Sequence, residues 1–139
     1  MSAPDDLDAW LRLLRTPGVG RDSARRLLAA CGSPEGVFSA SATTWRELVS
    51  AEIASALAKA PERHDEQLGA TRTWLAGDPA RRVLTLGEAD YPASWLESPD
   101  PPLLVYLQGR AELLSRPALA VVGSRNPTAQ GADNARAFQ

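Results

Sequence analysis

The stretch Ala120–Gly131, with the sequence AVVGSRNPTAQG, decides which fold this chain is expected to have. An apolar run over residues 118–122 leads into two glycines that bracket an arginine, an asparagine and a proline. Short apolar runs bounded by proline and glycine are typical of strands buried on both faces, and a helical pattern starts at residue 129. Strand, glycine turn and helix in this order predict the opening of a doubly wound α/β domain.

The turn in this stretch has the chemistry of an anion site. Gly123 permits a sharp change of direction, Ser124 offers a hydroxyl, and the forked guanidinium of Arg125 matches phosphate oxygens. The N-terminus of the following helix points back at the same place. The spacing is neither a dinucleotide fingerprint nor a Walker loop, since the only glycines within residues 120–131 are Gly123 and Gly131. On the residues alone, a phosphate site and a structural turn both stay open.

The segment before this stretch is also expected to be part of an α/β region. The run RRVLTL, residues 81–86, favours a strand, and LLVYLQG, residues 103–109, suits a strand buried on both faces. Between them, residues 91–102 contain four prolines, which exclude long regular structure. Residues 79–139 are therefore predicted to form the second of two domains.

Residues 1–78 have a helical pattern instead. Apolar side chains recur at helical spacing in two consecutive segments, namely Leu7, Trp10, Leu11 and Leu14, then Ala24, Leu27, Leu28 and Cys31. A turn and a short helix are expected over residues 32–40, and a helix capped by Thr43 or Thr44 over 45–49. Two more helices are expected, with the second running from Pro61 to Leu75. The fold class is thus α+β: an all-α domain, then the start of an α/β domain.

The first two helices are joined by TPGVG, residues 16–20, which predicts a helix-hairpin-helix of the SAM-like kind. Val19 should pack inward, while the free N–H groups at the start of the second helix attract phosphate. Possible weak DNA contacts are Gly18, Gly20, Arg21 and Arg25. Gly20 is expected to be the less replaceable glycine, because it lies nearest the second helix. The alternative is a tight interhelical turn without DNA contact, which the neighbouring Asp22 favours.

The amino-acid composition limits the classes of function that this chain can have. The chain has 139 residues, 44% of them hydrophobic, and a net charge of −2, so it is globular and has no overall attraction to nucleic acid or membranes. His64 and Cys31 are each the only residue of their type, which leaves no material for a histidine metal site, a histidine catalytic pair or an intramolecular disulfide. No signal peptide or membrane span is evident, and a cytoplasmic location is expected.

The order of features resembles the DNA-processing protein A family (DprA, also called Smf) from about Leu11 to Phe138. After the PGVG hairpin, that family has a GSPE-type turn, which matches Gly32–Glu35 here. A segment of the form YP…L…DPP…L…G is matched by Tyr91-Pro92, Leu96, Asp100-Pro101-Pro102, Leu104 and Gly109. The motif VVGSR.PT..G, which opens the family's Rossmann-like domain, is matched by Val121–Arg125, Pro127, Thr128 and Gly131.

The resemblance implies a cytoplasmic bacterial protein that binds single-stranded DNA and helps load the recombinase RecA onto it, chiefly in natural transformation. Such a mediator is not an enzyme and needs no cofactor or metal, and the resemblance implies a possible homodimer of the full-length protein. The phosphate ligand carries over to Arg125, in a loop shaped by Gly123, Ser124 and Gly131. Tyr91 and Pro92 are expected to anchor the linker against the α/β domain.

Family members continue after this last helix with more strands and helices. The resemblance therefore implies that the chain is the N-terminal part of such a protein, with a truncated Rossmann-like DNA-binding domain. Two other functions stay open on the sequence. Nucleotide phosphoribohydrolases of the "lonely guy" type open a similar sheet with a Gly-Ser loop, and the helical domain alone suits a protein-interaction module.

Overall fold

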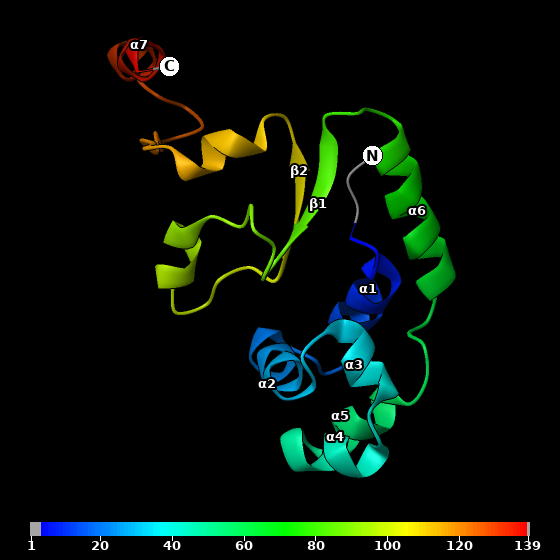
Figure 1. Ribbon diagram of the computed structural model, residues 1–139. Helices are drawn as coiled ribbons and strands as arrows, with labels where there is room; N and C mark the ends of the chain where they lie inside the picture. Colours follow the sequence, from blue (N-terminus) through cyan, green and yellow to red (C-terminus); the bar gives the residue numbers. More distant parts are fainter. Residues whose placement is uncertain (1–3, 139) are drawn as a thin grey trace.

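A computed structural model describes residues 4–138, in which a helical body precedes a two-stranded sheet and a C-terminal helix (Figure 1). The helices of the body are α1 (Leu7–Arg15), α2 (Arg21–Cys31), α3 (Pro34–Ser39), α4 (Ala42–Leu48), α5 (Ala51–Leu57) and α6 (His64–Ala76). The remaining elements are β1 (Arg81–Thr85), the 3-10 helix η1 (Ala93–Glu97), β2 (Leu104–Gln108), the 3-10 helix η2 (Ala111–Ser115) and α7 (Ala129–Ala137). This order confirms the predicted helical domain followed by the start of an α/β region. Within residues 4–138, no helix is long and apolar enough to cross a membrane.

Serine caps divide residues 33–57 into three short helices. The hydroxyl of Ser33 accepts from the Gly36 N–H, and Ser41 and Ser50 cap α4 and α5 in the same way. Each cap satisfies one of the amides that the first turn of a helix leaves without a partner. The cap of α4 is therefore Ser41 and not Thr43 or Thr44, since an earlier serine is already in the extended conformation that a cap requires.

The helices enclose two neighbouring apolar clusters that also include residues of the sheet region. Buried side chains of the first cluster are Trp10, Leu13, Ala24, Leu27, Val37, Trp45, Val49, Ala54, Leu57 and Leu103. Those of the second cluster are Leu7, Leu11, Leu68, Leu75 and Val83. Leu103 precedes β2 and Val83 lies in β1, so both strands are attached to the helical body by apolar packing.

β1 and β2 form an antiparallel pair in which Val83 lies opposite Tyr106. Bonds from the Leu86 N–H to the Leu103 carbonyl and from the Gly109 N–H to the Ala80 carbonyl extend the pairing at both ends. The expectation that residues 103–109 form a strand buried on both faces is wrong. β2 is half-buried: its Tyr106 contacts Thr71 and Trp74 of α6, but among residues 4–138 no further strand lies beside β2 in this two-stranded sheet.

The C-terminal segment differs from its expected form in one respect. The loop after Gly123 and the helix α7 are present, but residues 118–122 have no strand assignment. Leu119 is 71% exposed and Val122 is 89% exposed. No strand of the described chain lies beside these residues, and a strand exists only where another strand completes its hydrogen bonds. In Figure 1, α7 stands apart from the helical body.

We expect amide hydrogen exchange to change along the chain near Gly109, and not at the predicted domain boundary after residue 78. Amides of the β1–β2 pair are bonded across the strands and lie over the buried Val83 and Leu84, whereas residues 116–126 are exposed and have no ladder. The paired residues 81–85 and 104–108 should therefore exchange as slowly as α1 and α2. Exchange followed by mass spectrometry on the whole chain measures this. Exchange over 81–85 and 104–108 that is as fast as over 116–126 would contradict the packing.

Candidate nucleic-acid interface

The hairpin between α1 and α2 is confirmed as a tight turn. The Val19 N–H donates to the Thr16 carbonyl over 3.1 Å, and the Thr16 hydroxyl donates to the Arg12 carbonyl over 2.7 Å. Val19 is half-buried against the first apolar cluster. The turn therefore fixes the direction in which α2 leaves α1 and holds its N-terminus at the surface.

The two hairpin glycines differ in a way that reverses the sequence-based ranking. Gly18 has φ +84°, a left-handed conformation, and a Cβ there would lie 3.2 Å from Ile53 Cγ1. Gly20 caps α2 with φ −89° and ψ 178°, which any residue adopts, and a Cβ there would meet nothing within 4 Å. Gly18 is thus the constrained position, and the prediction that Gly20 is the less replaceable glycine is wrong.

The basic residues of the hairpin converge on a carboxylate from the proline-rich linker. Arg21 Nη2 lies 2.6 Å from Asp100 Oδ2, and Arg25 Nη2 bonds both Asp100 Oδ1 and, over 3.1 Å, the Pro101 carbonyl. The hydrogen bond from Arg25, with the charge of Arg21, lowers the pKa of Asp100. The charges of Arg21 and Arg25 already face Asp100. Contact of these two arginines with DNA stays a prediction.

Sequence reasoning missed this role of Asp100, although it quoted the Asp-Pro-Pro motif. Within the linker, the Tyr91 hydroxyl donates to the Pro102 carbonyl over 2.7 Å. Tyr91 packs edge-to-face on Trp95 with ring centroids 5.4 Å apart, and burial raises the pKa of its phenol. These contacts hold the linker to itself, and the bonds of Arg25 to Asp100 and Pro101 hold it to α2 of the helical domain. That Tyr91 and Pro92 anchor the linker against the α/β domain stays a prediction.

The Gly-Ser-Arg loop is fully exposed, from Gly123 to the start of α7. The Ser124 hydroxyl oxygen accepts from the Asn126 N–H over 3.0 Å, which leaves its own O–H available as a donor. No ion pair or hydrogen bond of the Arg125 guanidinium occurs among residues 4–138. The loop therefore presents a hydroxyl donor and a positive charge to solvent.

The first turn of α7 has a cap that sequence reasoning did not single out. The Gly131 N–H donates to Thr128 Oγ1 over 3.0 Å, so this amide is used by the cap and is not free for phosphate. A Cβ at Gly131 would lie 3.2 Å from the same oxygen, which explains a glycine at this position. The signal for Thr128 was present in the sequence, since threonine before a helical pattern favours the N-cap.

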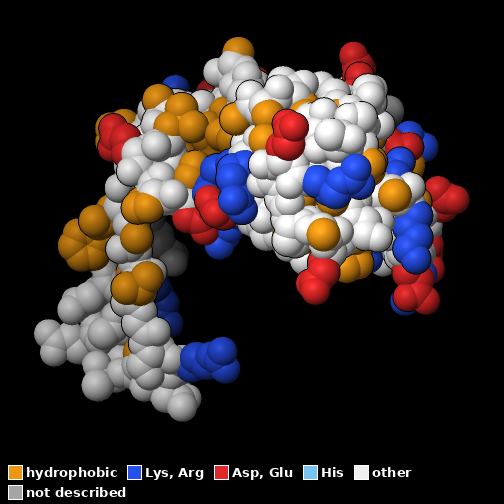
Figure 2. All heavy atoms as spheres, turned by 90° about the horizontal axis from the view of Figure 1, so that it is seen from below, with side chains coloured by type: hydrophobic (Ala, Val, Ile, Leu, Met, Phe, Trp, Pro, Cys, Tyr) orange, Lys and Arg blue, Asp and Glu red, His pale blue; other side chains and the backbone are white. Residues whose placement is uncertain are grey.

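The C-terminal arm, residues 113–132, contains two arginines and no acidic residue. Arg116 and Arg125 are exposed, whereas Arg110 and Arg136 on either side pair with Glu112 and Asp133. On the face that Figure 2 shows, basic and acidic side chains are interspersed and no broad patch of one sign covers the helical body. The arm is thus an acid-free segment in which positive charges without a facing carboxylate are available to a polyanion.

The structure does not bring the two predicted contact sets together. The hairpin turn between α1 and α2 lies in the helical body, and α7 lies at the far end of the arm (Figure 1).

His64 has a structural role: it is 7% exposed, begins α6, and its Nε2 lies 2.5 Å from Asp8 Oδ1 on α1. Among residues 4–138, no three metal-ligating side chains gather at one place.

Comparison with known proteins supports the two halves of the chain separately. Residues 4–41 match the family model of the DprA-like N-terminal helix-hairpin-helix domain. Residues 82–139 match the model of the DNA recombination-mediator protein A family. Together the two matches cover more than half of the chain and occur in the order that the resemblance implies. No curated protein and no solved structure matches the chain significantly.

Replacing Gly18 by alanine should lower the free energy of unfolding by about 1–2 kcal/mol, the cost of a left-handed conformation for a residue with a Cβ. Contact with Ile53 adds to this cost. Gly20→Ser is the matched control and should change stability by at most a few tenths of a kcal/mol, because serine is a favourable N-cap. Urea unfolding measures both. A larger loss for Gly20→Ser than for Gly18→Ala would contradict the turn geometry.

The ion pair of Asp100 should make stability depend on pH. Because its pKa is lower in the folded state, the pair stabilises the fold above pH about 4 and this contribution is lost as pH falls through the lowered value. The stability difference between the wild type and Asp100→Asn should therefore be largest at neutral pH and shrink in acid. Asp22→Asn is the control, since Asp22 only makes a 3.8 Å contact with Arg26. Identical pH profiles for both variants in urea unfolding would remove Asp100 as the anchor.

Proposed function

Because this chain belongs to the DNA recombination-mediator protein A family, we propose that it is the N-terminal part of a mediator that binds single-stranded DNA. In this proposal the complete protein helps load the recombinase RecA onto DNA taken up in natural transformation. It acts in the cytoplasm by binding alone, without a catalytic step or a cofactor. The family match favours this role over the phosphoribohydrolase alternative.

The observation that carries the proposal is the acid-free arm with its exposed Gly-Ser-Arg loop. Arg125 has no carboxylate partner among the described residues, and the Ser124 O–H lies next to it in sequence. Both groups precede the N-terminus of α7, where the helix dipole favours a negative charge. A guanidinium, a hydroxyl and a helix N-terminus are a suitable set for one backbone phosphate.

A phosphate contact determines what kind of DNA recognition is possible here. Phosphates carry no base identity, so contacts to them position the strand without selecting a sequence. For one such contact on a single strand, log affinity falls with the logarithm of the salt concentration with a slope of only about −0.7. We therefore propose sequence-independent binding, with Arg125 as one of several contacts that a complete site needs.

The helical body has a different part in this proposal. We propose residues 1–78 as a helical domain and 79–139 as the start of the Rossmann-like DNA-binding domain, with the linker held on α2 by Asp100. A DNA phosphate at the hairpin would have to displace Asp100 from Arg21 and Arg25. Hairpin contacts with DNA, if formed, are thus weaker than contacts on the arm.

We expect Arg125→Ala to weaken binding to single-stranded DNA by about tenfold, the lower end of what a hydrogen bond to a charged group contributes. The loss should be the same on oligo-dT, oligo-dA and oligo-dC, and the salt dependence should become less steep by about 0.7. Fluorescence anisotropy with labelled oligonucleotides at several salt concentrations measures both quantities, in this chain and in any longer form of the protein.

Arg72→Ala provides the matched control for this experiment. Arg72 is an exposed arginine on α6, away from the arm, and it has no ion pair among residues 4–138. Its loss changes the net charge by the same amount and should leave affinity nearly unchanged. Unchanged affinity for Arg125→Ala on every homopolymer would remove Arg125 from the site. A loss on one homopolymer alone would show that Arg125 contacts a base.

A further inference from the structure

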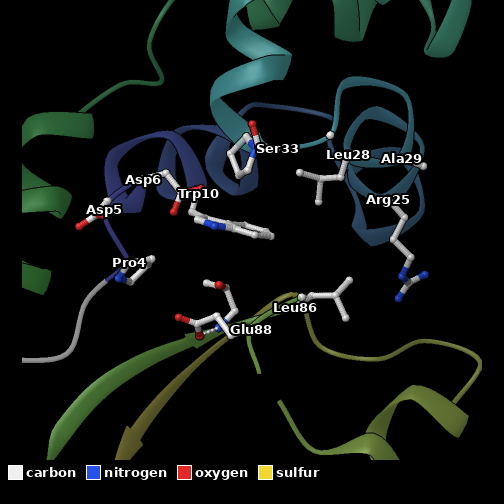
Figure 3. Close-up of a pocket in the computed structure, with 14 residues that line it drawn as sticks. Pro4, Asp5, Asp6, Trp10, Arg25, Leu28, Ala29, Ser33, Leu86 and Glu88 are labelled. Atoms are coloured by element: carbon white, nitrogen blue, oxygen red, sulfur yellow. Dashed lines mark hydrogen bonds between the residues drawn. The ribbon is translucent and has the colours of Figure 1, made fainter. Parts of the chain in front are cut away.

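A groove of about 890 Å³ lies between the helical body and the turn that follows β1 (Figure 3). Its upper wall comes from the segment before α1, from α2 and from the α2–α3 turn, and its lower wall comes from Thr85–Glu88. It is an open groove and not an enclosed cavity, and it belongs neither to the Gly-Ser-Arg loop nor to the hairpin turn. It therefore needs its own explanation.

The floor of the groove is apolar. In Figure 3 the indole of Trp10 lies in the middle, with Leu28 on the helical side and Leu86 on the strand side. Leu28 and Leu86 are half-buried, and Ala29 on the wall is exposed. Trp10 is only 5% exposed and belongs to the first apolar cluster, so the apolar surface open to another chain comes from Leu28, Ala29 and Leu86 and suits one large apolar side chain.

The rim of the groove is acidic. Asp5 and Asp6 border it on one side, and neither has an ion pair among residues 4–138. Glu88 on the other side accepts from the Thr85 N–H over 2.7 Å and lies 4.0 Å from Arg82, so its charge is already partnered. The one basic side chain in the lining, Arg25, has its charge facing Asp100. The unpaired charge at the rim, from Asp5 and Asp6, is therefore negative, which repels nucleic acid and attracts cationic side chains.

We propose that this groove binds a short peptide segment of a partner protein that places a large apolar side chain between Leu28 and Leu86, beside Trp10, and carries lysine or arginine on either side of it. The apolar floor supplies the contact area, and the rim carboxylates select the flanking charges. Single-stranded DNA does not fit this charge pattern. The inference does not depend on DNA binding by the arm, since the two surfaces share no residue.

The test uses the whole chain, labelled with nitrogen-15, and a synthetic peptide with the core Lys-Lys-Leu-Phe-Lys-Lys. Two control peptides replace the lysines by glutamates or the Leu-Phe pair by alanines. The indole N–H signal of Trp10 should shift on titration with the first peptide alone. The signal of Trp45, whose Nε1 donates to the buried Val37 carbonyl over 2.8 Å, is the internal control and should not move.

Variants on α2 separate the groove from the rest of the surface. Ala29 lines the groove and Ala30 does not, and both are exposed alanines on the same helix. Ala29→Arg should weaken peptide binding by about tenfold or more through its bulk and charge, whereas Ala30→Arg should have little effect. Replacing Asp5 and Asp6 together by asparagine should weaken binding several-fold and reduce its salt dependence.

Three outcomes would overturn the proposal. One is the absence of a Trp10 shift with the first peptide at millimolar concentration. A second is equal binding of all three peptides, or equal effects of Ala29→Arg and Ala30→Arg. The third is a Trp10 shift caused by an oligonucleotide, or by raising the concentration of the chain alone, in place of the peptide. The last result would assign the groove to DNA or to a second copy of the chain.

Discussion

The burial of Leu103 in the helical core is the contact on which the arrangement of this chain depends. Leu103 is 3% exposed and lies among side chains of the first apolar cluster, directly before β2. Full burial of a leucine stabilises a fold by about 1.5–3 kcal/mol, whereas the ion pair of Asp100 is screened by solvent and contributes less. Leu103 therefore supplies more of the attachment than Asp100 does, together with Val83 of β1 in the second cluster. Asp100 sets the path of the linker, because its pairs with Arg21 and Arg25 fix where the linker crosses α2.

This attachment explains both candidate binding surfaces. It brings the turn after β1 close to α1 and α2, and the space left between them is the groove around Trp10. It also leads the chain away from the helical body after β2, so that the arm and its Gly-Ser-Arg loop are exposed. One surface is apolar with an acidic rim, and the other has positive charge without a facing carboxylate. A protein chain and a polyanion are thus directed to different places on the same molecule.

The hairpin illustrates how a recognisable motif can have a structural role in a given protein. Its turn and helix N-terminus have the geometry that binds phosphate in other proteins. In this chain, Arg21 and Arg25 face the carboxylate of Asp100, and the carbonyl of Pro101 accepts a further bond. The motif therefore connects two parts of the chain, and DNA would compete with an internal anion for the same charges.

The sequence by itself determined the helical domain, the hairpin and the glycine loop before α7, because these depend on local periodicity, caps and turn residues. It did not determine that Gly18 and not Gly20 is constrained, since φ and the contact with Ile53 depend on how α5 packs beneath the turn. Nor did it determine the partner of Arg21 and Arg25, which lies about 75 residues further along the chain. The direction of β2 and the absence of a strand over 118–122 were likewise decided by tertiary structure. A strand's hydrogen bonds and burial come from whichever neighbour the fold places beside it, and the local sequence does not specify that neighbour.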